Sequence, residues 1–533
     1  MTVRANAEQT EIQNSVSRRS FLKTIAAGGA AVGGASAFGS LLADAPFASA
    51  ATARRGGDLT FARTADPQTV DPSAAIDTES IWTCLSLYEC LYNVTADGHG
   101  TTPWLATGYN ISSDQRAWTF HLRPGVKFSD GRPLDSSDVR FTLERALKGP
   151  NAYILSAVDA IDTPNASTVV IHTTHPWGPL LGDTSMYSNA ILPNNLRGAT
   201  SKQFFQRPIG TGPFILESWA KGQKLQLKRN PHYWQKGKPY LDSVTLLTVP
   251  DDNTRLVQLK GGQADIIEGT PYSSIAALES TPGINVNLSK SSAVSFIVMN
   301  EKKPHFADVH VRRAISYAID RNSIIKDVLF GHATPAASFF SPAWPFYQAS
   351  TPKLWYDPAT AKQEMAKSRY PKGFAATYAV VAGDGLNGTI AQIVQSNLKA
   401  IGIDLAIQSY DPSTLATLQS TAHYDMSPGL MTLDIGDPDE NVPAAAGGAY
   451  GGINSAYSWY NSAEVLKLIH QSELTIASAA RAKIYGQIQS IVAQDCPFAM
   501  LYYSPYPYAQ QSTVHGFNVP PTGAYHLENV WLS

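Results

Sequence analysis

Cysteine is scarce in this chain, and neither sign of charge dominates it. The 533 residues include three cysteines, Cys84, Cys90 and Cys496, whose spacing fits no zinc motif. Cys84 and Cys90 lie in a run that could be helical, where their offset does not place the side chains together. A disulfide between them stays open, but unpaired buried thiols are the simpler expectation. The 41 lysines and arginines nearly balance the 43 aspartates and glutamates, which argues against a nucleic-acid binder or a polybasic membrane anchor.

Common motifs of catalytic and metal sites are also missing. The chain has no Gly-x-Ser-x-Gly and no His-Glu-x-x-His, and its 12 histidines are scattered. The nearest pair, His172 and His175, lies where an expected strand ends and is more typical of surface residues. Paired catalytic carboxylates leave no such signature, so a secreted hydrolase is kept as an alternative. We expect no enzyme activity, no catalytic residue, no metal and no cofactor.

The N-terminus carries the pattern of an export signal. A twin-arginine motif is formed by residues 17–23, Ser-Arg-Arg-Ser-Phe-Leu-Lys, and an alanine- and glycine-rich segment follows over residues 24–42. Small residues suited to cleavage lie at Ala48-Ser49-Ala50. A retained membrane anchor is the alternative, since the segment is nearly long enough, but its composition favours removal. We predict a twin-arginine signal peptide over residues 1–50 and a mature protein, without a lipid anchor, in the periplasm or outside the cell.

The chain is too long for one hydrophobic core. At 533 residues it exceeds the roughly 250–300 at which a single core stops growing, so two or more lobes are expected. Residues 118–131 alternate apolar and polar side chains between tight turns, as two half-buried strands do. Asp135 is then placed to cap a helix that runs to about residue 147, and Asp138 can complement the same helix end.

This stretch resembles the signature of the large extracytoplasmic solute-binding proteins that serve peptide and nickel ABC importers. Residues 118–131 match the family's Trp-x-Phe-x-Leu-Arg-x-Gly-Val-x-Phe-x-Asp-Gly. Further matches follow in chain order: Tyr-Glu-x-Leu at 88–91, Asn-x-x-Tyr-Trp at 230–234 and Phe-x-Asp-x-x-Val-Arg-x-Ala at 306–314. The Gly-Thr-Gly of residues 210–212 lacks the continuation of a phosphate loop, and in the family it is a structural turn.

The resemblance implies an α/β fold of two lobes, the class II, cluster C type of periplasmic binding protein, with an extra peripheral subdomain. We expect lobe one over residues 51–294, with the subdomain at about 92–200, lobe two over 295–500, and a return to lobe one over 501–533. Two crossing strands would form a hinge on which the lobes close around a ligand.

The acidic run from Met431 to Asn441 is the strongest candidate for the ligand site. Peptide-binding members carry Trp-x-x-Asp-x-x-Asp/Glu-Pro here, and the resemblance implies that Asp434 binds the α-amino group of a peptide. A carboxylate in a closed, dewatered cleft bonds strongly to an ammonium group. Asp437 precedes a proline and is expected to form a turn. A solvated acidic turn and a calcium loop are alternatives, although the spacing is not that of a calcium loop. Met431 replaces the tryptophan of peptide binders, which leaves the peptide nature of the ligand open.

Two further groups of residues are candidates for the cleft. The first combines aromatic rings with an amide, which suits a ligand and equally suits a core: Asn454, Tyr457 and Trp459. In family members the loop of the second group faces the ligand: Asp77, Thr78 and Glu79. Thr78 and Glu79 would equally serve as helix-capping residues.

The function implied by the resemblance is that of a substrate-binding receptor. It would capture a small solute, first of all a di- or oligopeptide, and deliver it to the ABC permease subunits of the inner membrane. We expect a monomer. A receptor for an oligosaccharide, an opine-like conjugate or a metal chelate is the alternative.

Overall fold

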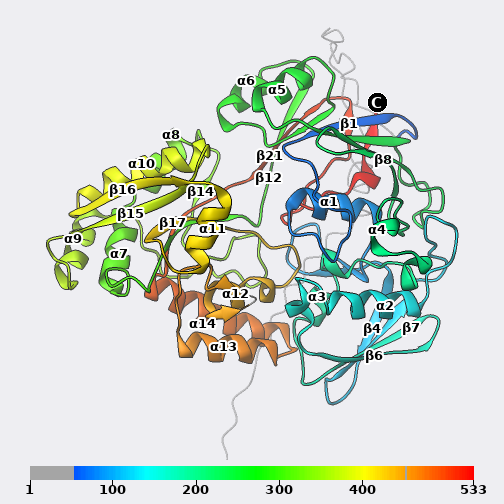
Figure 1. Cartoon of the computed structure of the whole chain (residues 1–533), viewed down its shortest axis with the longest axis horizontal. Helices are drawn as coiled ribbons and strands as arrows, with labels where there is room; N and C mark the ends of the chain where they lie inside the picture. The colour runs from blue at the N-terminus through cyan, green and yellow to red at the C-terminus, as the bar shows by residue number, and fades with distance from the viewer. Residues whose placement is uncertain (1–52, 451–452) are drawn as a thin grey trace, which may run out of the picture. The chain divides into compact units, whose positions relative to one another are not determined.

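The computed structural model describes residues 53–450 and 453–533, which build two large sheets with helices around them (Figure 1). The predicted twin-arginine signal of residues 1–50 lies outside the described residues. The first sheet has the strand order β12 (Ile284–Ser289), β21 (Tyr506–Gln511), β11 (Ile266–Glu268), β1 (Asp58–Arg63), β10 (Ser243–Thr248), β9 (Lys224–Arg229) and β8 (Phe214–Ala220). It is mixed, because β1 pairs in parallel with β10 and β11 while β9 and β21 run antiparallel to their neighbours.

The second large sheet and a smaller one complete the β-structure. The second sheet has the order β14 (Thr334–Pro335), β20 (Phe498–Tyr503), β13 (Val294–Met299), β17 (Met426–Met431), β15 (Phe374–Val381) and β16 (Ile403–Tyr410). A four-stranded antiparallel sheet has the order β4 (Ala106–Ile111), β5 (Ala117–Leu122), β7 (Thr168–Thr173) and β6 (Val158–Asn165). Three short pairs are β2 (Tyr92–Val94) with β3 (Thr101–Pro103), β18 (Ala449–Tyr450) with β19 (Ile453–Asn454), and β22 (Val514–His515) with β23 (Trp531–Leu532).

Helices pack around the sheets. The helices that precede β13 are α1 (Thr78–Leu87), α2 (Ser136–Ala146), α3 (Leu180–Asp183), α4 (Ser201–Phe204), α5 (Asp252–Lys260) and α6 (Ile275–Glu279). Those that follow it are α7 (Val309–Ala318), α8 (Arg321–Asp327), α9 (Pro358–Lys367), α10 (Gly385–Lys399), α11 (Pro412–Ser420), α12 (Val442–Ala446), α13 (Ala463–Glu473) and α14 (Ser478–Asp495). Over residues 53–450 and 453–533, no helix combines the length and apolar character needed to cross a membrane.

The chain passes between the two large sheets twice. It leaves the first sheet after β12 and enters the second at β13, and it returns between β20 and β21. One hydrogen bond ties the two connecting segments together, because Ser291 Oγ of the first donates to the carbonyl of Ser504 of the second. After the return, Phe517 packs against Phe61 of β1 at a ring-centroid distance of 5.7 Å. The C-terminal residues therefore belong to the core of the first sheet.

The stretch that carries the family signature forms the first of the two strands predicted for it and the predicted helix. The second predicted strand, at residues 126–128, was wrong: turns at 124–125 and 129–130 leave too few residues between them, and only an isolated bridge pairs Lys127 with Pro133. Trp118, Phe120 and Leu122 of β5 are buried, while His121 between them is exposed. The Asp135 carboxylate accepts from the amide of Ser137 at 2.8 Å, and Asp138 accepts from the amide of Asp135 at 2.9 Å. This reciprocal capping box satisfies amides that would otherwise be orphaned at the helix start, and it confirms the predicted beginning of α2.

One buried carboxylate joins two of the family motifs and Trp104. Glu89, which follows α1, accepts hydrogen bonds from Trp104 Nε1 at 2.8 Å, Trp234 Nε1 at 3.0 Å and Tyr233 Oη at 3.1 Å. Burial raises the pKa of Glu89 to about 7, and these donors work in the opposite direction. The Tyr-Glu-x-Leu and Asn-x-x-Tyr-Trp motifs therefore occur together because their side chains satisfy one another in the interior.

The glycines of residues 210–212 have a structural role, as predicted. The amide of Gly212 donates to the carbonyl of Leu87 at 3.0 Å. A Cβ on Gly210 would lie 2.1 Å from the same oxygen, so the chain can approach α1 only without side chains here. The three cysteines are free and buried, as the sequence led us to expect.

Candidate ligand-binding site

A cavity of about 570 Å³ lies between segments from the two sides of the first crossing. Ile76, Tyr153, Met186 and Tyr187 line it from the part of the chain before β13. Strands β13 and β17, the loop over residues 432–441 and helix α12 line it from the other part. The volume is within the range of pockets that hold small solutes, and walls from two sides can enclose a ligand.

Two carboxylic acids lie together in this cavity. Asp434 and Glu440 both line it, and their side chains hydrogen-bond to each other. Glu440 Oε2 also accepts from the amide of Asp434 at 2.7 Å and from the amide of Ile435 at 3.1 Å. Asp434 is partly open to the cavity but lies deep in the protein, and this burial raises its pKa to about 6. Burial, followed by the charge of Asp434, raises the pKa of Glu440 well above its usual value.

The loop owes its shape to a neighbouring ion pair. Asp437 accepts from the amide of Asp439 at 3.0 Å and caps the short helix η5 (Pro438–Glu440), which turns the chain so that Glu440 comes back to Asp434. Arg481 of α14 pairs with the Asp437 carboxylate, with Nη2 2.8 Å from Oδ1. Asp437 is therefore a turn former, as predicted, and its charge is already compensated inside the protein.

Segments from the two sides of the crossing touch closely beside the cavity. A Cβ on Gly182 of α3 would lie 2.6 Å from Cβ of Asp437, and a Cβ on Gly436 would lie 2.3 Å from the carbonyl oxygen of Gly100. The amide of Gly178 donates to the carbonyl of Glu473 at 2.6 Å. Glycine at these positions lets the two backbones meet, so the cavity is bounded by a tight seam.

The structure separates the predicted cleft residues into two sets. Asp434, Met431 and Tyr457 line the cavity. Trp459 is half-buried and lies beneath the Lys302 ammonium, 5.7 Å from the ring centroid, and Asn454 lies in β19. That any of these residues contacts the ligand stays a prediction.

The loop before α1 differs in detail from the expectation. The helix cap is Asp77, whose carboxylate accepts from the amide of Ser80 at 2.9 Å, so Thr78 and Glu79 are the first residues of the helix rather than its cap. Glu79 accepts from Thr64 Oγ1 at 3.0 Å. The residue of this loop that lines the cavity is the exposed Ile76. Sequence reasoning missed it because an apolar residue before a cap gives no functional signal.

Glu440 was also missed as a partner of Asp434. The two are six residues apart, a spacing with no standard meaning, and only the turn at η5 brings them together. Within the part of the chain that the structure describes, no three His, Cys, Asp or Glu side chains are grouped to hold a metal ion.

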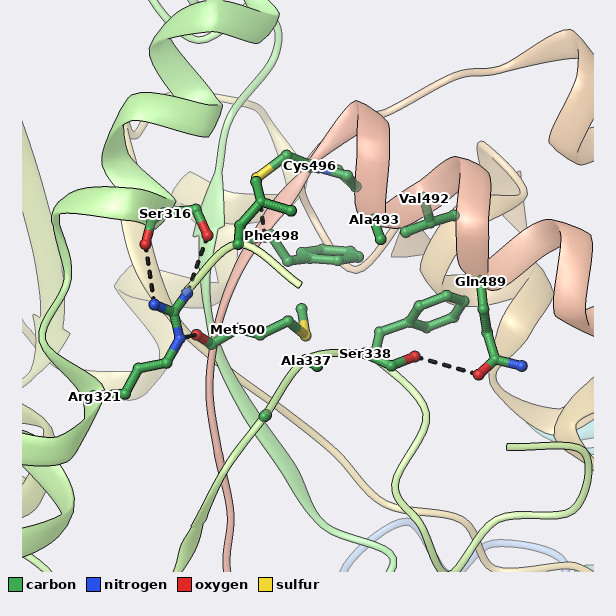
Figure 2. Close-up of a pocket in the computed structure, with 14 residues that line it drawn as sticks. Ser316, Arg321, Ala337, Ser338, Gln489, Val492, Ala493, Cys496, Phe498 and Met500 are labelled. Carbon is green, nitrogen blue, oxygen red and sulfur yellow. Dashed lines mark hydrogen bonds between the residues drawn. The ribbon is translucent and has the colours of Figure 1, made fainter. Parts of the chain in front are cut away.

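A second, far smaller cavity lies beside strand β20 of the second large sheet. It measures about 20 Å³, enough for one water, and is shown with its lining residues in Figure 2. Arg321, 3% exposed, donates from Nε to the carbonyl of Met500 at 2.6 Å and from its other nitrogens to the carbonyl and hydroxyl oxygens of Ser316 at 3.0 Å. Burial lowers the pKa of Arg321 to about 10, so it stays charged at neutral pH.

Comparison with known proteins identifies the family. The family of bacterial extracellular solute-binding proteins, family 5 Middle, matches residues 100–452. The chain is 29% identical over 475 residues to the probable D,D-dipeptide-binding periplasmic protein DdpA of Escherichia coli K12, covering 87% of this chain and 92% of that protein. It superposes on DppA of Helicobacter pylori in complex with the peptide STSA with a TM-score of 0.78 and 26% identity, covering 90% of this chain and 98% of the other.

A relative with a different type of ligand has the same fold. AgaA of A. tumefacien R10, solved with agropinic acid, gives a TM-score of 0.77 at 27% identity, covering 90% of this chain and 99% of that one. These relatives are two-lobe periplasmic binding proteins rather than enzymes, and the predicted fold class is confirmed. The chain belongs to the family 5 bacterial extracellular solute-binding proteins.

Proposed function

We propose that the protein is the solute receptor of an ABC importer and that its solute is a peptide or a related amine. The observation that carries the proposal is the cavity of about 570 Å³, which holds Asp434 and is walled by segments from both sides of the crossing. The division proposed is lobe one over 51–294, lobe two over 295–500 and a return over 501–533. The chain binds its solute without converting it.

The relatives support a peptide. DdpA is named for a D,D-dipeptide and DppA was solved with a tetrapeptide, STSA. In this chain the Asp434 carboxylate is placed to accept from the amino group of the solute, with Met431 and Tyr457 beside it. A charge-assisted hydrogen bond in such a cavity is stronger than one in water.

Binding works through a shift between open and closed lobes. Contacts to both walls of the cavity exist only when the lobes are closed, so the solute stabilises the closed form. The seam at Gly182 and Gly436 then sets how closely the walls can approach. The closed form is presented to the permease of the inner membrane. The twin-arginine signal delivers the protein, as a monomer, to the far side of that membrane.

The proposal is tested by finding the solute and removing its anchor. Mass spectrometry of the denatured protein would detect a trapped solute, and a thermal-shift screen of di- and tripeptides would find others. Asp434→Ala should weaken the best solute by about 2–5 kcal/mol in calorimetry, the scale for leaving one partner of a buried charge pair unpaired. Asp159→Ala, at an exposed carboxylate of β6, is the matched control and should have no effect. A protein that neither traps nor binds any solute would contradict the proposal.

A further inference from the structure

The charges around the cavity are of one sign. Asp434 and Glu440 are its acidic residues, and no lysine, arginine or histidine is among the described residues that line it. The remaining described lining is apolar or neutral. Ile76, Met186 and Phe296 are examples of its apolar walls.

The groups that face the acid pair from neighbouring elements are neutral phenols. The charges of both acids contribute to raising the pKa of Tyr153 from η1 (Ala152–Leu155), of Tyr187 from η2 (Tyr187–Asn189) and of Tyr506 from β21. The nearby Arg481 is engaged by Asp437. Asp183 and Asp439, also buried close by, add negative charge if they ionise.

The pair itself carries about one negative charge. Two carboxyl groups that share a hydrogen bond in a buried site do not both ionise, since like charges at this distance repel strongly. Asp434 is partly open to the cavity, whereas Glu440 is buried and its Oε2 is occupied by the amides of Asp434 and Ile435, so Asp434 is the acid that a solute can reach. A bound solute with one positive charge would leave the cavity neutral.

A free carboxylate on the solute would have no partner here. It would lose its water, meet no cation among the described lining residues and approach a carboxylate of the same sign, and each of these is unfavourable. A dipeptide with both ends free would bring such a group into the cavity together with its amine.

We infer that the cavity selects a monocation: an ammonium or guanidinium group on an apolar body, without a free carboxylate inside the cavity. Asp434 makes the contact with the cation, and Glu440, which is hydrogen-bonded to it and shares the single negative charge of the pair, holds Asp434 in place. The inference rests on the proposed function and narrows it. Among peptides, it favours amides and other peptides whose carboxyl end is blocked.

The test uses solutes that differ in one charge. Calorimetry would compare leucyl-leucinamide with leucyl-leucine and with N-acetyl-leucyl-leucinamide. A panel of other dipeptide amides would be compared with the free dipeptides, and phenethylamine with phenylalanine. We expect each bound amide or amine to bind at least tenfold tighter than its matched free acid, and the acetylated form to bind at least a hundredfold more weakly.

Equal or tighter binding of the free acids would overturn the inference, and so would a panel in which no amide or amine binds. Either result is distinguishable from failure of the receptor function, because mass spectrometry would still find a trapped acidic or neutral solute. A protein without any solute would count against both.

Two variants test the assigned roles. Asp434→Asn removes the charge and should weaken the tightest amide at least a hundredfold. Glu440→Gln keeps a neutral donor beside Asp434. The loss of affinity for the same amide should therefore be at least tenfold smaller than the loss caused by Asp434→Asn. Equal losses in the two variants would contradict the assignment of the solute contact to Asp434. Asp159→Asn is the matched control on the surface.

Discussion

Two of the buried charge sites in the described part of the chain, at Arg321 and at Asp434, solve the same physical problem in opposite ways. Arg321 has carbonyl and hydroxyl partners for its guanidinium, and only about 20 Å³ of space beside it. Asp434 has a second acid hydrogen-bonded to it, no cation among the described cavity residues, and about 570 Å³ of space in front of it. The first charge is satisfied by the fold, and the second, as we propose, is compensated by a solute.

The difference gives a way to tell structural from functional charges. A buried ion that the protein satisfies completely contributes to stability, since its partners would otherwise lose their hydrogen bonds. A buried ion that the protein leaves without a counter-charge costs stability in the empty protein and is compensated when the ligand binds. Each site therefore predicts a different response to substitution.

The largest effect is expected at the satisfied site. Arg321→Met would leave the carbonyls of Met500 and Ser316 without donors in the core, so the free energy of unfolding should fall by about 3–4 kcal/mol in urea titrations. Arg140→Met is the matched control, because Arg140 lies on the surface of α2 and pairs with the exposed Glu144, and its effect should stay within about 0.5 kcal/mol. Equal effects at the two arginines would remove the basis of the comparison.

The next effect is the pH dependence of solute binding. Asp434 has a pKa of about 6 in the empty protein, and only its ionised form attracts a cation. A proton therefore competes with the solute as the pH falls below about 6. Calorimetry with an amide solute should show about tenfold weaker binding at pH 5 than at pH 7.5, or ~1.4 kcal/mol. An affinity independent of pH over this range would mean that Asp434 is not the counter-charge.

Much of the fold could be predicted from the sequence because its signals are local. The alternation around Phe120 and the reciprocal cap of Asp135 and Asp138 depend on residues close together in the chain. Glu89 was recognised only as part of a family motif, and its role was not predicted, since its donors Trp104 and Trp234 come from distant segments. Local pattern gives elements, but contacts between elements decide which polar residues are satisfied.

The site shows the same limit more strongly. Asp434 could be proposed because a family motif marks its position, and the structure places it in the cavity. Its partner Glu440, the apolar Ile76 and the seam glycine Gly182 carry no local signal, because their roles arise only where the chain brings separate segments together. A helix cap was correctly offered as an alternative for the loop before α1, but it was assigned to Thr78 and Glu79. The structure has Asp77 as the cap.

The smallest effect is expected on the stability of the solute-free protein at Asp434. Burial raises the pKa of Asp434 above its ordinary value, so the folded protein binds more protons than the unfolded chain between about pH 4 and 6 and loses stability as the pH rises through this window. Asp434→Asn removes that loss. Without solute, its free energy of unfolding at pH 7.5 should exceed that of the wild type by ~1–2 kcal/mol, allowing for the solvent that the cavity admits, and the two should be equal near pH 4. The measurement is urea unfolding of the solute-free proteins at both pH values, with Asp159→Asn as the control. A variant less stable than the wild type at pH 7.5 would mean that the fold, and not the solute, satisfies Asp434. The fold would then satisfy both buried charges, Arg321 and Asp434.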